Sequence, residues 1–409
     1  MANTLTTMAA AFKYVHDNKL NDLKPNCAIV QEMAGTLKES DALGRKYLYP
    51  VVLGYELGIT YGTGDAFSYN DDIAGLYDEA ELDCTPVVLK SRVSLEAADR
   101  MSKSSKTVLS HAALRLGQMK QSLTKFAEID CIHGRRGFAI SALSSVDTGP
   151  EPDQRTITFA ADWAPGVWAG MVGAALDGYD GATKQNANAD FNLVSVNFAE
   201  QKIIISGHNT DLTALAVGEK IYFKGSYTNG MYGLLYQLDN AGSLFGIDAA
   251  VYDLWKASEF AVTGALTVAK ILEGATKAEE KGGLDEDSVL LCSSRAYNLL
   301  NSDITALRMF DGSYKDVAEI GNKGIIIKSS FGKIRVVGHP MMSVGYAMMA
   351  PEKGVKKVGS TDITFGSPVK PGEIIEHLES VHAYQVTGRY SYQVFAQEPA
   401  KCVLYTGLT

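Results

Sequence analysis

The sequence predicts an α+β fold with a protruding β-hairpin arm, because four stretches of different composition follow one another between Tyr47 and Gly134. An apolar extended run, KYLYPVVLGYELGITYGTG, comes first, and an acidic stretch follows it. The run TPVVLKSRVSLEA is typical of a returning strand, and a long helical pattern then ends at EIDCIHG. Because a two-stranded arm exposes backbone edges and apolar side chains, this order favours assembly with partners over an enzyme core.

Length and composition exclude several classes of protein. At 409 residues the chain is long enough for two or three domains, and its 46% apolar and 21% charged residues are ordinary for a folded protein. The net charge of −9 argues against a dedicated nucleic-acid binder. No apolar run approaches the ~20 residues that cross a bilayer, and the N-terminus lacks the pattern of a signal peptide.

The cysteines form no metal or redox motif, because no two of them have CxxC or zinc-like spacing. We expect reduced and mostly buried thiols. The five are Cys27, Cys84, Cys131, Cys292 and Cys402.

The elements up to Gly134 are predicted as follows. The polar first 46 residues hold a short amphipathic segment near Ile29–Leu37, which we expect to dock on the rest of the chain. Tyr47–Thr60 is predicted as an edge-type strand, with Thr85–Val93 as its antiparallel return. A helix is predicted over Ser104–Ile129, and Gly134 is expected to stop it in the left-handed conformation. The apolar stripe of this helix is Ala112, Leu116, Met119, Leu123 and Phe126.

Beyond Gly134 the pattern alternates between strands and helices. A Gly/Asn/Asp-rich loop at 177–190 opens a β-rich stretch with the short strands FNLVSVNF, KIIISG and KIYFKG. A helix is predicted over Ala265–Glu280, with a stop at Gly282-Gly283. Long alternating strands are predicted from Glu373 onward. Three further strands are Val289–Cys292, Ile325–Lys328 and Ile334–Gly338, the last two joined through Phe331-Gly332.

The sequence predicts no catalytic, cofactor or metal site. It contains no GxxxxGK[ST], GxGxxG, HExxH or GxSxG motif, and its histidines are dispersed. Asp285-Glu286-Asp287 and the 177–190 loop lack calcium-loop spacing, so solvated turns are expected. His208-Asn209-Thr210-Asp211 is predicted as a hairpin turn. The histidines are His16, His111, His133, His208, His339, His377 and His382.

An aromatic cleft is an alternative from another class. Trp163, Trp168 and Tyr179 could line a ligand site of an enzyme or sugar-binding protein. They lie in an apolar, glycine-rich stretch, where core packing is the commoner explanation.

The charge pattern is more informative. Between Gly64 and Cys84 there are seven acids and no Lys or Arg, whereas eight bases and two acids lie between Lys90 and Lys125. Both segments could simply be solvated surfaces. Alternatively, the acidic tip of one subunit lies on the basic region of the next, and charge alone leaves both interpretations open. The acids are Asp65, Asp71, Asp72, Asp78, Glu79, Glu81 and Asp83. The bases are Lys90, Arg92, Arg100, Lys103, Lys106, Arg115, Lys120 and Lys125.

The order of these elements resembles that of the major capsid proteins of tailed bacteriophages, which have the Hong Kong 97-type fold. PVVLGYELGITYGTG is similar to the first strand of the family's extended loop, and MKQSLTKFAEIDCIHG to the end of its spine helix. Similar stretches are GEKIYFKGSYTNGMYGLLYQL, GSLFGIDAAVYDLWKA, GKIRVVGHPMM and the ending RYSYQVFAQEPAKCVLYTGLT. The specific part of the resemblance is the order of these stretches.

The resemblance implies a division of the chain into named parts. These are an N-terminal arm (1–46), an extended β-hairpin loop (47–93), a peripheral domain with the spine helix (94–134), an axial domain (135–359) with a small β insertion at about 185–240, and closing strands of the peripheral and axial domains (360–409).

The resemblance also implies the function of a non-catalytic virion shell. Hexamers and pentamers would form an icosahedral capsid in the host bacterial cytoplasm, with the loop of each subunit over its neighbour. Implied partners are packaged double-stranded DNA, through non-specific contacts, a portal, a decoration or cement protein and a scaffolding protein. The scaffolding protein is expected to be separate, since ~46 residues before the loop are too few for a domain. An encapsulin-like compartment shell, enclosing an enzyme, is the alternative with the same fold.

Overall fold

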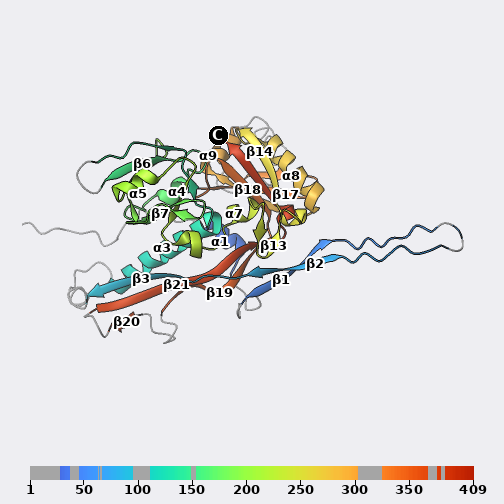
Figure 1. The fold of residues 1–409 in the computed structure, drawn as a ribbon, viewed down its shortest axis with the longest axis horizontal. Coiled ribbons are helices and arrows are strands. Elements are labelled where there is room, and N and C mark those ends of the chain that lie inside the picture. The colour runs from blue at the N-terminus through green and yellow to red at the C-terminus, as the bar shows by residue number, and fades with distance from the viewer. Residues whose placement is uncertain are drawn as a thin grey trace, which may run out of the picture.

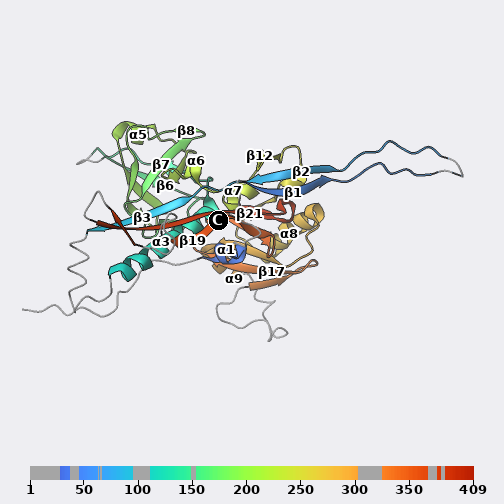
Figure 2. The same cartoon turned by 90° about the horizontal axis from the view of Figure 1, so that it is seen from below.

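The computed structural model describes residues 28–36, 46–62, 64, 67–94, 111–148, 153–302, 325–366, 375–378 and 383–409. A body of packed sheets and helices carries a two-stranded arm that projects far beyond it in both views (Figure 1 and Figure 2). Within these ranges, no helix is long and apolar enough to cross a membrane.

One part of the body is an eight-stranded sheet in the order β4-β11-β7-β9-β10-β6-β5, with β8 paired to β7. Its buried face includes Ile157, Leu193 and Ile203. The strands predicted near 191, 202 and 220 are confirmed, but their sheet begins at Phe138 and so is not confined to the expected insertion. Its strands are β4 (Phe138–Ala139), β5 (Ala142–Leu143), β6 (Gln154–Thr158), β7 (Ala175–Asp180), β8 (Thr183–Lys184), β9 (Phe191–Asn197), β10 (Lys202–Ser206) and β11 (Lys220–Phe223).

Two short helices connect strands of this sheet, α4 (Pro165–Trp168) and α5 (Asn209–Ala214), and α6 (Ser226–Asn229) and α7 (Leu234–Leu238) follow its last strand. The hairpin turn predicted at His208–Asp211 is wrong, because His208 precedes α5 and Asp211 lies in its first turn. Buried Asp211 accepts hydrogen bonds from the backbone N–H groups of Asn188 and Ala189. These hydrogen bonds attach α5 to the loop before β9.

A second part is a six-stranded mixed sheet in the order β14-β22-β18-β15-β17-β16. Its strands are β14 (Ser258–Gly264), β15 (Ser288–Ser293), β16 (Ile325–Lys328), β17 (Lys333–His339), β18 (Tyr346–Pro351) and β22 (Val403–Leu408). The helices of this part are η2 (Asp253–Trp255), α8 (Val268–Gly282), α9 (Ser294–Asn301) and η3 (Pro399–Lys401). The predicted helix with its Gly282-Gly283 stop is confirmed, since Gly283 is left-handed with φ 62°. The predicted β16–β17 hairpin is also confirmed.

The third sheet contains β19 (Val355–Phe365), β20 (Ile375–Leu378), β21 (Ala383–Ala396) and β3 (Val87–Ser94). Its presence corrects the predicted arm. The segment predicted to return the arm is β3, and it pairs antiparallel with β21, almost 300 residues later in the chain. The arm is instead β1 (Tyr47–Gly54) paired with the acidic β2 (Leu76–Leu82), and the small hairpin of β12 (Ser243–Leu244) and β13 (Ile247–Asp248) lies at its root.

The long helix α3 (His111–His133) packs against β21, and its described part confirms the predicted stripe. Met119 and Leu123 are buried, and Leu116 and Phe126 are half-buried. The helix continues four residues past the predicted end at Ile129. The short helix α1 (Ile29–Ala34) packs on α3 and β19, so the expected docking of the Ile29–Leu37 segment is confirmed.

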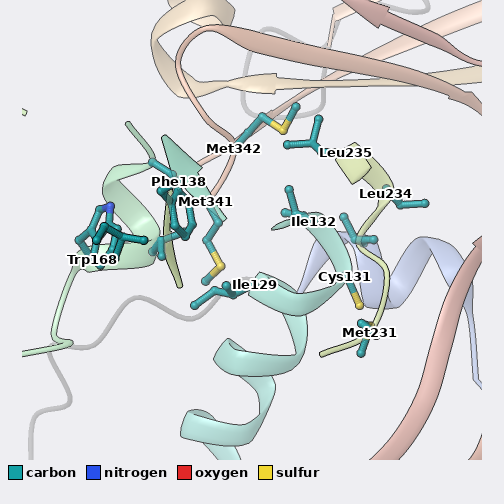
Figure 3. Close-up of a cluster of buried hydrophobic side chains, with 14 of the residues drawn as sticks. Ile129, Cys131, Ile132, Phe138, Trp168, Met231, Leu234, Leu235, Met341 and Met342 are labelled. Atoms are coloured by element: carbon teal, nitrogen blue, oxygen red, sulfur yellow. The ribbon is translucent and has the colours of Figure 1, made fainter. Parts of the chain in front are cut away.

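The last turn of α3 lies at the centre of the largest core. Ile129, Cys131 and Ile132 meet the loop after β17, which carries Met341 and Met342 (Figure 3). The described cysteines are free; Cys131, Cys292 and Cys402 are buried, Cys84 is half-buried, and Cys27 lies outside the described residues.

Gly134 ends α3 for a reason other than the predicted one. Positive φ falls on Arg135 (56°) and Gly137 (67°), not on Gly134. A Cβ on Gly134 would lie 2.3 Å from the carbonyl oxygen of Met231 and 2.5 Å from that of Asp130. Close backbone approach therefore requires glycine here.

We predict opposite effects for two Gly→Ala substitutions in and beside α3. Gly134→Ala should lower the free energy of unfolding by about 2 kcal/mol or more, because backbone must move to admit the methyl group. Gly117→Ala should raise it by about 0.5–1 kcal/mol, since this exposed helical glycine has nothing within 4 Å of its Cβ position. Denaturant titration measures both, and equal effects of the two substitutions would contradict the packing argument.

Candidate assembly interface

The arm is anchored to the body only at its root. Tyr47, Tyr49 and Val51 of β1 share the side of the ribbon that packs on the body, where Tyr49 meets Phe395 edge-on at 5.3 Å. The backbone N–H of Glu81 donates to the carbonyl oxygen of Phe245, 2.8 Å away. Leu53, Ala80 and Leu82 complete this small core with Trp255.

A β-bulge lies where the arm leaves the body. Val52 pairs with Tyr77 but Gly54 pairs with Leu76, so Leu53 is an extra residue in β1. Its side chain is buried in the core at the root. Beyond the bulge the two segments continue side by side, with the N–H of Leu57 bonded to the carbonyl oxygen of Ile73 at 3.1 Å.

The bulge gives the first segment of the arm one continuous apolar side, which Glu81 and Glu79 of β2 border across from Leu48 and Pro50. Before it, the even-numbered residues of β1 point away from the body, opposite to the side that packs on the body. After it, the odd-numbered residues lie on this side, because Leu57 stands across from Ile73, which is on the same side of its segment as Gly75 and Tyr77. The residues of the first segment on this outward side are Leu48, Pro50, Val52, Tyr55, Leu57, Ile59 and Tyr61. The opposite side beyond the bulge carries Gly54, Glu56, Gly58 and Thr60.

The arm also holds most of the exposed apolar surface. Of the 19 large hydrophobic residues that are exposed in the described part of the chain, 11 lie between Leu48 and Tyr77. Tyr55 is 86% exposed, Tyr61 88% and Tyr69 84%, and Leu57 and Ile59 are each 61% exposed. Folded monomers rarely leave a contiguous patch of this kind uncovered, so it marks a contact surface.

The predicted acids lie along the arm and are not gathered at its tip. Asp71 and Asp72 are on the outer part of the returning segment, while Asp78, Glu79 and Glu81 are within β2. Asp83 follows β2, and Asp65 lies outside the described residues. Among the described residues, the arm carboxylates form one ion pair, between Glu81 and Lys46 at the root.

The predicted bases are distributed over β3 and α3. Lys90 and Arg92 are exposed on β3, where the Arg92 Nε donates to Gln385 at 3.2 Å, and Lys120 is exposed on α3. Arg100, Lys103 and Lys106 lie outside the described residues, as does the side chain of Arg115. None of the described bases pairs with a described acid of the arm. The structure therefore leaves the predicted contact between subunits as a prediction.

Lys125 does not fit the predicted basic surface. Its side chain is buried, and its ammonium donates to the carbonyl oxygen of Ala169 within the same chain. Burial lowers the pKa of Lys125 to about 8. The helical spacing does not predict this burial, because Lys125 lies two residues after Leu123 and one before Phe126 and is therefore off the apolar stripe.

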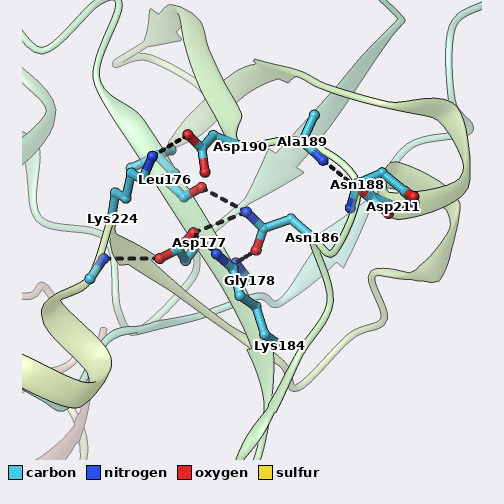
Figure 4. Close-up of polar contacts among 11 residues, drawn as sticks. Leu176, Asp177, Gly178, Lys184, Asn186, Asn188, Ala189, Asp190, Asp211 and Lys224 are labelled. Atoms are coloured by element: carbon cyan, nitrogen blue, oxygen red, sulfur yellow. Dashed lines mark hydrogen bonds and ion pairs between the residues drawn. The ribbon is translucent and has the colours of Figure 1, made fainter.

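The other candidate sites are structural. Asp177 is buried and bonded to Lys184, Asn186 and the N–H of Gly225, which fixes the loop up to Asp190 (Figure 4). Asp285 and Glu286 pair with Lys401. No cluster of metal-ligating side chains occurs within the described ranges.

The aromatic residues Trp163, Trp168 and Tyr179 are core residues and do not line a cleft. Trp168 is fully buried and stacks on Phe159 at 5.4 Å, and Trp163 is 3% exposed. Tyr179 is 9% exposed and stacks on Tyr227 at 4.1 Å. These positions favour the packing interpretation over a ligand site.

Sequence reasoning missed two polar groups at the end of α3, fully buried Glu128 and half-buried Asp130. Glu128 contacts His339, and Asp130 accepts a hydrogen bond from the hydroxyl of Tyr390 at 2.6 Å. Burial raises the pKa of Asp130 to about 6, and the Tyr390 hydrogen bond partly opposes that rise. Asp130 stands four residues after Phe126, so continuing the apolar stripe would have predicted its burial.

Comparison with known proteins identifies the fold. No family model and no curated protein matches the sequence. A chain of the cyanophage A-1(L) capsid asymmetric unit is similar with a TM-score of 0.59 over 100% of both chains, at 10% identity. A chain of the capsid of the native GTA particle is similar with a TM-score of 0.52 over 100% of both chains, at 7% identity. The chain therefore has the fold of these capsid proteins over its whole length, and the predicted Hong Kong 97-type fold is confirmed.

We predict that Asp130→Asn stabilises the protein at high pH only. A carboxyl whose folded-state pKa is raised from 3.8 to about 6 costs stability above about pH 6, and this cost disappears as the pH falls toward 3.8. The amide keeps an oxygen for Tyr390 and carries no charge. Unfolding should therefore become harder by up to about 3 kcal/mol near pH 8 and change little near pH 4.

Urea titrations at the two pH values measure this difference. Asp71→Asn, on the exposed arm, is the control and should leave stability unchanged at both. A pH-independent effect of Asp130→Asn would contradict the assigned cause.

Proposed function

We propose that this chain is the major capsid protein of a tailed double-stranded DNA bacteriophage, which assembles with copies of itself into an icosahedral shell. The observation that carries the proposal is the projecting arm, whose continuous apolar side has no cover in the described part of its own chain. The capsid fold over the whole chain supports it. In this function the protein is a component of the virion and acts as a structural subunit.

A second copy of the chain is the partner that the arm fits best. Burying an apolar side chain such as Leu57 or Ile59 contributes about 1.5–3 kcal/mol, so a row of them binds strongly once covered. The acids of the arm complement the exposed bases Lys90, Arg92 and Lys120 on the body. Because each copy carries both surfaces, many copies can satisfy one another in a closed ring.

The finer features of assembly follow from this proposal. Hexamers and pentamers would place the arm of each subunit over the body of its neighbour. A separate scaffolding protein, a portal and a decoration protein would complete the particle, and the shell would contact packaged DNA without sequence preference. Assembly would take place in the host bacterial cytoplasm.

Substitution on the two sides of the arm tests this function. The wild-type protein, expressed with its scaffolding protein, should form capsomers or shells visible by electron microscopy. Leu57→Ser with Ile59→Ser should raise the protein concentration needed for assembly by about 100-fold or more, because two covered apolar groups are lost. The unfolding midpoint of the subunit should stay unchanged, since both side chains are already exposed there.

Glu56→Ser with Thr60→Ser, on the opposite side of the same segment, is the matched control and should assemble normally. Shells formed by the Leu57/Ile59 variant at the wild-type concentration would exclude the apolar side as the contact. A wild-type protein that stays monomeric with its scaffold would contradict the capsid function itself.

Charge reversal tests the second component of the contact. Changing Asp71, Asp72, Asp78 and Glu79 to Lys should block assembly and leave the circular dichroism spectrum of the subunit unchanged, because Asp71, Asp72 and Glu79 are exposed and Asp78 is only half-buried. Wild-type assembly should also depend on salt, since exposed pairs are screened within about 8–10 Å at ordinary ionic strength.

The control for charge reversal changes four exposed acids of the body, which gives the same shift in net charge. These are Glu200, Glu259, Glu273 and Glu280. If both quadruple variants fail to assemble equally, net charge and not the arm determines the result. Normal shells from the arm variant would disprove the electrostatic contact.

A further inference from the structure

The strand β14 forms one edge of the six-stranded sheet. It pairs with β22 on one side, where the N–H of Ser258 donates to the carbonyl oxygen of Cys402 at 3.0 Å. No strand in the described part of the chain pairs with its other side. Alternate residues of a strand direct their backbone groups to opposite sides, so those of Glu259 and Ala261 face away from β22. Such a row of backbone groups is a template on which another strand can add.

The two edges of this sheet differ in length. At the opposite end, β16 has four residues, and short edge strands are one way in which proteins prevent pairing between copies. β14 has seven residues, and its Phe260, Val262 and Thr263 are of types that favour strands. The longer edge therefore needs protection of another kind.

Two lysines of α8, the helix beside β14, bind carbonyl oxygens along this edge (Figure 1). The Lys270 ammonium donates to the carbonyl oxygens of Ala265 at 3.1 Å and Thr263 at 3.4 Å, and the Lys277 ammonium to that of Glu259 at 3.2 Å. Seven helical residues span about 10.5 Å and four strand residues about 13 Å, so flexible side chains cover the difference. The helix thus supplies donors at the spacing of the exposed acceptors.

A third lysine extends the row beyond the strand. Lys281 donates to the carbonyl oxygen of Lys256 at 2.9 Å and also pairs with Asp253 at 3.5 Å. Lys270, Lys277 and Lys281 follow one another at spacings of seven and four, so they share one stripe of α8. The contacts with the edge are therefore a repeated feature of the helix.

The position of Lys270 is unfavourable for the helix itself. It is the third residue of α8, after the N-cap Thr267, where the positive end of the helix dipole disfavours a cation. Its contacts outside the helix, with the carbonyl oxygens at the end of β14, offset that cost. The Lys277 ammonium lies 5.0 Å from the ring centroid of Phe260, so its stem also covers an apolar side chain of the edge strand.

A bulge adds to this protection. The pairing of β14 with β22 shifts between Ala261 and Gly264, and Thr263 and Gly264 have φ angles of 49° and 112°. Bulges twist an edge away from the flat geometry that a second strand requires. An incoming strand would therefore meet an irregular backbone as well as carbonyl oxygens that are already bound.

We propose that Lys270 and Lys277 close the outer edge of β14 to other copies of this chain. Their ammonium groups occupy the acceptors that a second β14 would need, and the like charges of two copies would repel one another across such a contact. This inference does not depend on the capsid function, because an open edge is a hazard in any concentrated protein. In a chain that assembles through its arm, the closed edge also removes a competing contact.

Removal of the two ammonium groups tests the proposal. Lys270→Met with Lys277→Met keeps long side chains with similar helix preference and removes the charge. In sedimentation velocity without scaffolding protein, this variant should associate at a concentration about tenfold or more below that of the wild-type protein. As it associates, hydrogen exchange of the Glu259 and Ala261 amides should slow by about tenfold or more, which distinguishes this contact from association through the arm.

Two further variants serve as control and reversal. Lys224→Met with Lys353→Met, at two exposed lysines outside α8, gives the same change in charge and apolar surface and should behave as the wild-type protein. Ala261→Pro, added to the Lys270/Lys277 variant, removes an N–H that faces away from β22 and should restore the wild-type behaviour.

Association no stronger than that of the control pair would overturn the proposal. The proposal would also be wrong if association left the β14 amides unprotected or was not reversed by Ala261→Pro, because the contact would then lie elsewhere. If methionine lowers the unfolding midpoint, Lys270→Gln with Lys277→Gln gives the same comparison without added apolar surface.

Discussion

Two backbones meet without side chains between them at the end of α3, and the arrangement of the body depends on that contact. The N–H of Gly233 donates to the carbonyl oxygen of Gly134 at 2.9 Å, and a Cβ on either residue would come within about 2.5 Å of the other segment. The next residues extend the junction. Arg135 bonds to the carbonyl oxygens of Gly230 and Thr228, and Arg136 pairs with buried Asp162 at 2.6 Å. One helix end thereby positions α7 and two sheets.

This junction combines tight packing with buried charge. Burying ionisable groups in a core costs desolvation free energy, and replacing them with apolar residues is often neutral or stabilising. Arg136 and Asp162 are nevertheless retained here, and the Arg136 guanidinium also lies over the ring of Tyr346 at 4.2 Å. Their hydrogen bonds and ion pairs are directional, whereas apolar contacts are not. Where several elements meet, these groups therefore select one packing arrangement, whereas a purely apolar junction would allow several.

The sequence predicted elements whose signals are local and missed pairings that are distant. The stripe of α3, the capped α8 and the β16–β17 hairpin depend on spacing and glycine, and all were recognisable. The arm was predicted with the wrong second strand. LYDEAEL is acidic and resembles a loop, but a ribbon exposed to solvent tolerates Asp and Glu that a buried sheet would not. The apolar β3 resembled the return strand, yet its partner β21 lies almost 300 residues away.

The same limits apply to the candidate interface. The acids and bases were identified from composition, and most of those described are exposed as expected. Lys125 is buried instead, because its position on the helix and not its charge determines its surroundings. The apolar side of the arm was not predicted, since the alternation changes phase at Leu53 and no local signal marks a bulge there.

This change in the alternation of side chains restricts how the sequence of the arm can change in evolution. Exchanging one apolar residue for another along its outward side leaves every other side chain on its own side and can occur singly. An insertion or deletion of one residue between Gly54 and Tyr61 would instead transfer every later side chain of that segment to the opposite side. Length changes are therefore tolerated in pairs, or together with a second bulge. With the extra residue at Leu53, the arm can vary more freely in the identity of its apolar side chains than in its number of residues.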